Sequence, residues 1–68
     1  MEGNLLTLSK REVEILNYLK LGFSSKEIAN NLCLSSHTVD THRRNMLRKA
    51  NVKNSAELVL FGVKSGII

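Results

Sequence analysis

The 68-residue chain contains no proline, no tryptophan and only one cysteine. A single cysteine cannot form a disulfide within the chain, so nothing indicates an oxidising compartment. No apolar run approaches about 18 residues, and no basic region precedes an apolar block at the N-terminus. The sequence therefore predicts neither a membrane span nor a signal peptide. From these absences we expect a cytoplasmic domain. A chain of this length has room for only one small core, so we expect no cofactor and no small-molecule ligand.

Positive charge is concentrated in one quarter of the chain. The net charge is +4, and five of the ten lysine and arginine residues lie within residues 41–56, a window without any acidic residue. A localised basic stripe on a folded module is typical of a polyanion site. A solvated helix face is the common alternative explanation of such a run. Charge alone leaves the two interpretations balanced.

Apolar residues recur every three or four positions, which predicts an all-α domain. Four polar residues that favour N-cap positions mark helix starts: Ser9, Ser24, Ser35 and Asn54. A glutamate three residues later predicts a capping box at three of these starts. We expect four helices, at about residues 9–21, 25–32, 36–50 and 55–65. Residues 1–7 are expected to form a flexible arm or linker remnant before the domain at 8–68.

The stretch from Ser25 to Lys49 has the layout of a helix-turn-helix. A short helix with an apolar face meets a tight turn, and a second helix then begins with small polar residues and gathers cations. At about 100° per residue, one stripe of this second helix is apolar, formed by Val39, Met46 and Ala50. The opposite side carries polar residues: His37, Asp40, Thr41, Arg44 and Arg48. This division suits a helix that lies in the major groove of DNA.

An ordered set of residues from Leu8 to Ile67 resembles the LuxR/FixJ-type (GerE-like) DNA-binding domain of bacterial transcription regulators. The matching pattern is L-S-K-R-E…G-x-S-S-K-E-I-A-x-x-L-x-L-S-x-x-T-V-x-x-H-x-x-N-x-L-x-K…V-x-N-x-A-E-L…G-I. The resemblance implies a four-helix output domain that binds double-stranded DNA as a homodimer, with helix 36–50 in the major groove. Many relatives carry this domain at the C-terminus of a response regulator or related regulator. RNA polymerase is a further candidate partner.

The resemblance also implies which side chains contact DNA. Its base-reading positions fall on Asp40, Thr41 and Arg44, and its backbone-contacting positions fall on Lys26, Thr38, Arg43, Asn45, Arg48 and Lys53. A carboxylate in a DNA groove is repelled by phosphates unless it accepts a hydrogen bond from cytosine or pairs with a neighbour. Arg44, four residues after Asp40, is such a neighbour. We therefore interpret Asp40 as a specificity residue that pairs with Arg44.

The predicted helix 55–65 is apolar almost all round. Four of its residues fit a core-facing stripe: Ala56, Val59, Leu60 and Val63. This choice leaves Leu58 and Phe61 without an internal partner, and exposed apolar surface marks a partner site. We therefore expect Leu58 and Phe61 to form a homodimer interface. The alternative is that both pack beneath helix 9–21.

Other candidate sites have simpler explanations. His37 and His42 lie about 140° apart on their helix and do not converge with Cys33, so no metal site is expected. Ser35 and Ser36 precede a histidine, but no orienting group or oxyanion cradle follows, and the chain is not expected to be an enzyme. We interpret His42 as structural and Cys33 as a small apolar turn residue of the usually buried kind.

Two other functions remain open beside DNA binding. A protein-interaction or dimerisation module that has lost direct DNA contact is favoured by the carboxylate of Asp40. RNA binding lacks the exposed aromatic residues that stack on unpaired bases. Sequence-specific binding to duplex DNA for transcription regulation is the leading interpretation.

Overall fold

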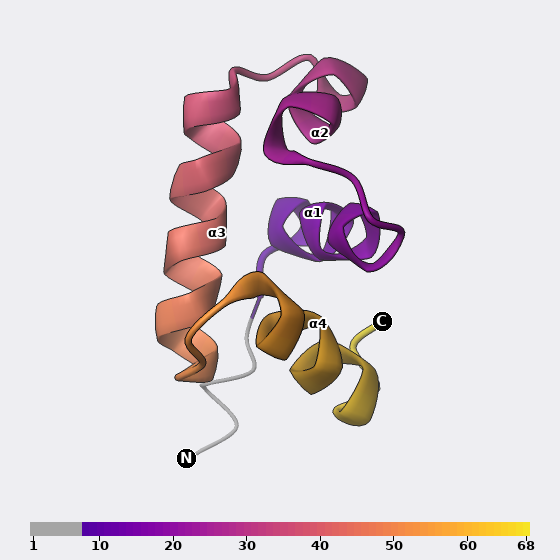
Figure 1. Cartoon of the computed structure of the whole chain (residues 1–68), viewed down its shortest axis with the longest axis vertical. Coiled ribbons are helices and arrows are strands. Elements are labelled where there is room, and N and C mark those ends of the chain that lie inside the picture. Colours follow the sequence, from indigo (N-terminus) through magenta and orange to yellow (C-terminus); the bar gives the residue numbers. More distant parts are fainter. Residues whose placement is uncertain (1–7) are drawn as a thin grey trace.

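The computed structural model describes residues 8–68, which form four α-helices joined by short turns (Figure 1). The helices are α1 (Lys10–Lys20), α2 (Ser25–Leu32), α3 (Ser36–Ala50) and α4 (Ser55–Lys64). The predicted all-α fold is confirmed, and the predicted helix bounds agree with the structure to within one residue. The expected N-terminal arm, residues 1–7, lies outside the described residues. No helix between residues 8 and 68 is long and apolar enough to cross a membrane.

The helices begin where their capping side chains lie. At each start, the N-cap side chain accepts a hydrogen bond from the backbone amide three residues later, at Ser9, Ser24, Ser35 and Asn54. The predicted capping boxes of α1 and α2 are both present. In α4, the carboxylate of Glu57 instead accepts from the backbone amide of Lys53, at 2.9 Å. The box expected there is therefore wrong, although the N-cap itself is correct.

Residues in the left-handed conformation end both α2 and α3, the two helices joined by the tight turn after Leu32. Cys33 ends α2 at φ 58°, and Asn51 ends α3 at φ 57°. Residues other than glycine are strained in this conformation, although asparagine tolerates it better than most. Cys33 is also exposed, so its interpretation as a cysteine of the usually buried kind is wrong. The tight turn keeps α2 and α3 packed against each other.

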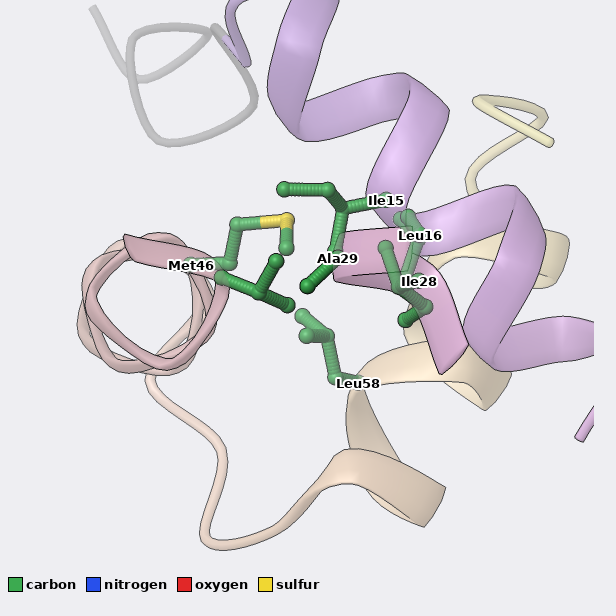
Figure 2. Packing of buried hydrophobic residues seen from close by; sticks show 7 residues of the cluster. Ile15, Leu16, Ile28, Ala29, Met46 and Leu58 are labelled. Carbon is green, nitrogen blue, oxygen red and sulfur yellow. The ribbon is translucent and has the colours of Figure 1, made fainter. Parts of the chain in front are cut away.

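The core lies where all four helices meet (Figure 2). Seven apolar residues are buried there: Ile15, Leu16, Ile28, Ala29, Val39, Met46 and Leu58. The predicted apolar stripe of α3 is confirmed, because Val39 and Met46 are fully buried and Ala50 packs against the cluster. Helices α1, α2 and α4 all lie on one side of α3, so its other side is free of the remaining helices (Figure 1).

The structure corrects the orientation expected for α4. Leu58 is 1% exposed and lies in the core, so its assignment to a dimer interface is wrong (Figure 2). Leu60 and Val63, which were expected to face the core, are 54% and 47% exposed. Because α4 is apolar almost all round, periodicity could not identify its buried face. Phe61 is half-buried, and its part in a dimer remains a prediction.

Helix α4 approaches α1 closely at a glycine. A Cβ added to Gly62 would lie 3.0 Å from Cδ2 of Leu16 and 3.1 Å from Cγ1 of Ile68. Both distances are shorter than ordinary contacts between carbon atoms. A side chain at this position therefore requires its neighbours to move.

Candidate nucleic-acid interface

The side of α3 that the other helices leave uncovered carries two exposed arginines and a half-buried threonine. Arg44 and Arg48 are exposed. The hydroxyl of Thr41 donates to the backbone carbonyl of His37 at 3.0 Å, and Nη2 of Arg44 lies 3.4 Å from the same hydroxyl. Nη1 of Arg48 is likewise 3.4 Å from Oδ1 of Asn45. Both arginine contacts are long, so the two guanidinium groups are held weakly and can turn toward another acceptor.

The other predicted backbone-contacting residues flank this face. Lys26 is exposed in the first turn of α2, and Lys53 is exposed in the turn that joins α3 to α4. Thr38 lies in the first turn of α3, where its hydroxyl is 2.9 Å from that of Ser35. Cations near a helix start, together with its free amides, favour a phosphate at that end. Thr38 and Lys53 therefore lie near the two ends of α3, and Lys26 follows Ser25, which contacts the middle of α3.

Asp40 pairs with residues other than the one expected. Its Oδ1 accepts a hydrogen bond from the hydroxyl of Ser25 at 2.6 Å and lies 4.0 Å from Nη1 of Arg43. The predicted pairing of Asp40 with Arg44 is therefore wrong. The side chain of Asp40 remains 48% exposed. Its negative charge is thus partly balanced within the protein, which lowers its repulsion of a phosphate backbone.

The guanidinium group of Arg43 is held between two other helices. Nη1 donates to the hydroxyl of Ser25 at the start of α2, and Nη2 donates to the hydroxyl of Ser55 at the start of α4. The side chain is 28% exposed. Neither serine stands out in the sequence, because each follows an N-cap residue and resembles an ordinary first-turn residue. No signal in the sequence joins them to a residue in the middle of another helix.

A second polar contact fixes α3 against α1. Nζ of Lys49 donates to Oε1 of Glu12 at 2.8 Å, and Glu12 is only 4% exposed. Burial acts to raise the pKa of Glu12. The hydrogen bonds from Lys49 and from the amide of Ser9, and the charges of Lys49 and His42, outweigh it and hold the pKa below its ordinary value of 4.5. Lys49, one of the cations in the basic window, therefore has a structural role.

Comparison with known proteins identifies the kind of domain. The family model described as bacterial regulatory proteins, luxR family, matches residues 6–61. The chain is 41% identical over 61 residues to the oxygen regulatory protein NreC of Staphylococcus carnosus, covering 90% of this chain and 28% of that protein. It is 43% identical over 60 residues to the uncharacterised response regulatory protein YgeK of Escherichia coli K12, covering 88% and 41%.

A solved structure has the same fold. The response regulator ChrA of a heme-sensing two-component system superimposes with a TM-score of 0.88 at 34% identity, over 91% of this chain and 31% of that one. The chain thus spans less than half the length of these relatives. It belongs to the luxR family of bacterial regulatory proteins, which are DNA-binding transcription regulators and not enzymes.

Proposed function

We propose that the chain reads a specific sequence of double-stranded DNA by placing α3 in the major groove, as the output domain of a response regulator or related regulator. One observation carries the proposal: Arg44 and Arg48 are exposed on a helix whose opposite stripe, Val39 and Met46, is fully buried. The major groove of B-DNA is about 12 Å wide and admits one α-helix. A helix that is uncovered along one side by the rest of its domain fits this requirement (Figure 1).

Three residues of α3 are proposed to contact base edges. Arg44 can donate two hydrogen bonds to guanine, and the methyl group of Thr41 can contact that of thymine. Asp40 uses Oδ1 for Ser25 and Arg43, and its half-exposed carboxylate can accept from N4 of cytosine through the other oxygen. Together these contacts would select among base pairs.

Phosphate contacts are proposed for the residues around this face. The exposed cations are suited to neutralise phosphates, and the polar side chains can donate hydrogen bonds to them. The residues concerned are Lys26, Thr38, Asn45, Arg48 and Lys53. Such contacts would fix the register of α3 without reading sequence.

Dimerisation is proposed to use α4. Leu60 and Val63 form an exposed apolar strip on α4, and Phe61, next to Leu60 in the chain, is half-buried. A second copy of the domain is the simplest partner for this strip, and it would place two recognition helices on half-sites one helical turn apart. We further propose that the protein acts in the cytoplasm and that the DNA-bound dimer contacts RNA polymerase.

The test begins with selection of bound duplexes from a random-sequence pool. Arg44→Ala is then expected to weaken binding to the selected duplex by about 1–3 kcal/mol while leaving binding to unselected duplex nearly unchanged. Arg11→Ala is the matched control, because Arg11 lies on α1 and pairs with Glu14. Gel shifts at constant low salt provide the measurement.

Two results would contradict the proposal. An equal loss on selected and unselected duplex would make Arg44 a phosphate contact and not a base-reading residue. The absence of binding to any duplex at low salt would favour a protein-interaction module in its place.

A further inference from the structure

Arg43 joins three helices through one side chain. Its two terminal nitrogens donate to hydroxyl groups of Ser25 in α2 and Ser55 in α4, while its own backbone belongs to α3. These serines are 18 and 12 residues away in sequence. The side chain of Arg43 is 28% exposed, whereas Arg44 and Arg48 on the same helix are exposed. These bonds use two of the five N–H donors of the guanidinium group and fix its plane between the two serines, away from a free orientation toward a phosphate.

The position of Arg43 on α3 also favours contacts within the protein over a contact with DNA. At about 100° per residue, Arg43 lies about 40° from the buried Val39 and about 100° from the exposed Arg44. It therefore emerges beside the core stripe, on the flank of the face proposed to enter DNA. From this flank, the planar guanidinium group reaches two acceptors at once, which a lysine ammonium group on a flexible stem cannot reproduce.

We propose that Arg43 is a positioning residue for DNA reading: it holds the first turns of α2 and α4 against α3 and does not neutralise a phosphate. This inference rests on the proposed function. The hydroxyl of Ser25 accepts from Arg43 and donates to Asp40, so the same contacts set the orientation of a proposed base-reading carboxylate. Ser25 also precedes Lys26 in α2. Its contacts with Arg43 and Asp40 therefore fix the distance between Lys26, a proposed phosphate contact, and the exposed face of α3.

The experiment compares charge with geometry at two arginines. The variants Arg43→Lys and Arg43→Gln are matched with Arg48→Lys and Arg48→Gln in the full 68-residue chain. The probes are the duplex enriched by the wild-type chain from a random pool and the unselected pool itself. Binding is measured by fluorescence anisotropy over a salt series, at a temperature where circular dichroism shows every variant to be folded.

Both Arg43 variants are expected to weaken binding to the selected duplex about tenfold, as for loss of a hydrogen bond to a charged group, with a smaller loss on the unselected pool. The slope of log affinity against log salt should stay at the wild-type value for Arg43→Gln. Arg48→Gln should reduce its magnitude by about 0.9 per protomer, and Arg48→Lys should keep most of the binding.

A double-mutant cycle identifies the route of the effect. Ser55 lies on α4, away from the proposed reading face, yet Ser55→Ala is expected to weaken binding to the selected duplex. In the Arg43→Gln background, the same change should have almost no further effect, because the bond is already lost. Fully additive losses would show that the two residues act independently and would overturn the inference.

The remaining outcomes separate the inference from the proposed function. If Arg43→Lys binds like the wild type while Arg43→Gln lowers the salt slope, Arg43 contacts a phosphate and the inference fails. If the variants only lose thermal stability and keep wild-type affinity and discrimination when folded, the role is structural and the inference also fails. A wild-type chain that binds no duplex contradicts the proposed function and, with it, this inference.

Discussion

Glu12 holds together two helices that are far apart in the sequence. Its carboxylate accepts from the amide of Ser9 at the start of α1, at 2.9 Å, and from Lys49 near the end of α3, at 2.8 Å. The side chain is almost fully buried, so it is screened little by water. Loss of its charge would leave Lys49 without this partner and weaken the contact between α1 and α3.

The lowered pKa of Glu12 makes stability depend on pH. Because the folded pKa lies below 4.5, the unfolded chain binds the proton more readily, and the contribution of Glu12 is complete above the unfolded pKa. It is lost as pH falls through the folded pKa. Glu12→Gln, which can keep the capping bond, is expected to lower the free energy of unfolding by about 1–2 kcal/mol at pH 7 and to flatten its dependence on pH below about 5.

Urea denaturation between pH 7 and pH 3 provides the measurement for Glu12. Glu14→Gln is the control, because Glu14 lies in the same helix and forms only a surface pair with Arg11. If both variants show the same change with pH, the ion pair with Lys49 does not contribute.

At the residue scale, contacts within a helical turn were predictable from the sequence and contacts between helices were not. The bonds of Glu12 and Glu27 to their N-cap residues follow from a spacing of three residues, which the chain displays directly. The pairing of Glu12 with Lys49 spans 37 residues and depends on how α1 crosses α3. The contacts of Arg43 with Ser25 and Ser55 depend on tertiary packing in the same way.

At the scale of elements, helix limits were predictable and the buried face of α4 was not. Caps are local, so the starts of all four helices follow from single side chains. The buried stripe of α3 was also predictable, since charged residues exclude every other orientation. In α4, apolar residues occupy most positions, and only packing against α1 and α3 decides that Leu58 faces inward and Leu60 outward.

The turn between α2 and α3 contains strain that a substitution can release. Cys33 adopts φ 58°, a conformation that costs roughly 1–2 kcal/mol for a residue with a Cβ and little for glycine. The greater freedom of glycine in the unfolded chain offsets part of this gain. Cys33→Gly is therefore expected to raise the free energy of unfolding by about 0.5–1 kcal/mol.

Asn51→Gly is the matched control for Cys33→Gly. Asn51 has nearly the same backbone conformation, φ 57°, and asparagine tolerates this region. Its replacement should raise stability less than Cys33→Gly does, because asparagine and glycine both serve as left-handed C-caps. Chemical denaturation of both variants tests the difference, and destabilisation by Cys33→Gly would show that the cysteine side chain makes a contribution larger than the strain.

At the scale of the whole molecule, the cations divide into structural and exposed groups. Lys49 pairs with Glu12, and Arg43 binds two serines, whereas Lys26, Arg48 and Lys53 are exposed. The basic window is visible in the sequence, but this division is not, because it depends on which helices lie near each cation. Only the exposed group is available to release counterions from DNA.

This division predicts the salt dependence of DNA binding. The three exposed cations that are proposed to contact phosphates, with one phosphate each, give a slope of log affinity against log salt of about −5 for a dimer and about −3 for a monomer. Fluorescence anisotropy with the selected duplex measures the slope. A value near −7 would indicate that Arg43 also contacts a phosphate, and a flat response would contradict an electrostatic contribution.

The missing side chain at position 62 has a consequence for the spacing of DNA half-sites. In the proposed dimer, each copy contacts the other through α4 and reads a half-site through α3. The angle between these two helices therefore determines the distance between the half-sites. Because Gly62 has no Cβ, α4 can pack close to Leu16 of α1. If the methyl group of Gly62→Ala displaces α4 and not only the side chains of Leu16 and Ile68, the preferred separation of the two half-sites will shift although no residue that touches DNA has changed.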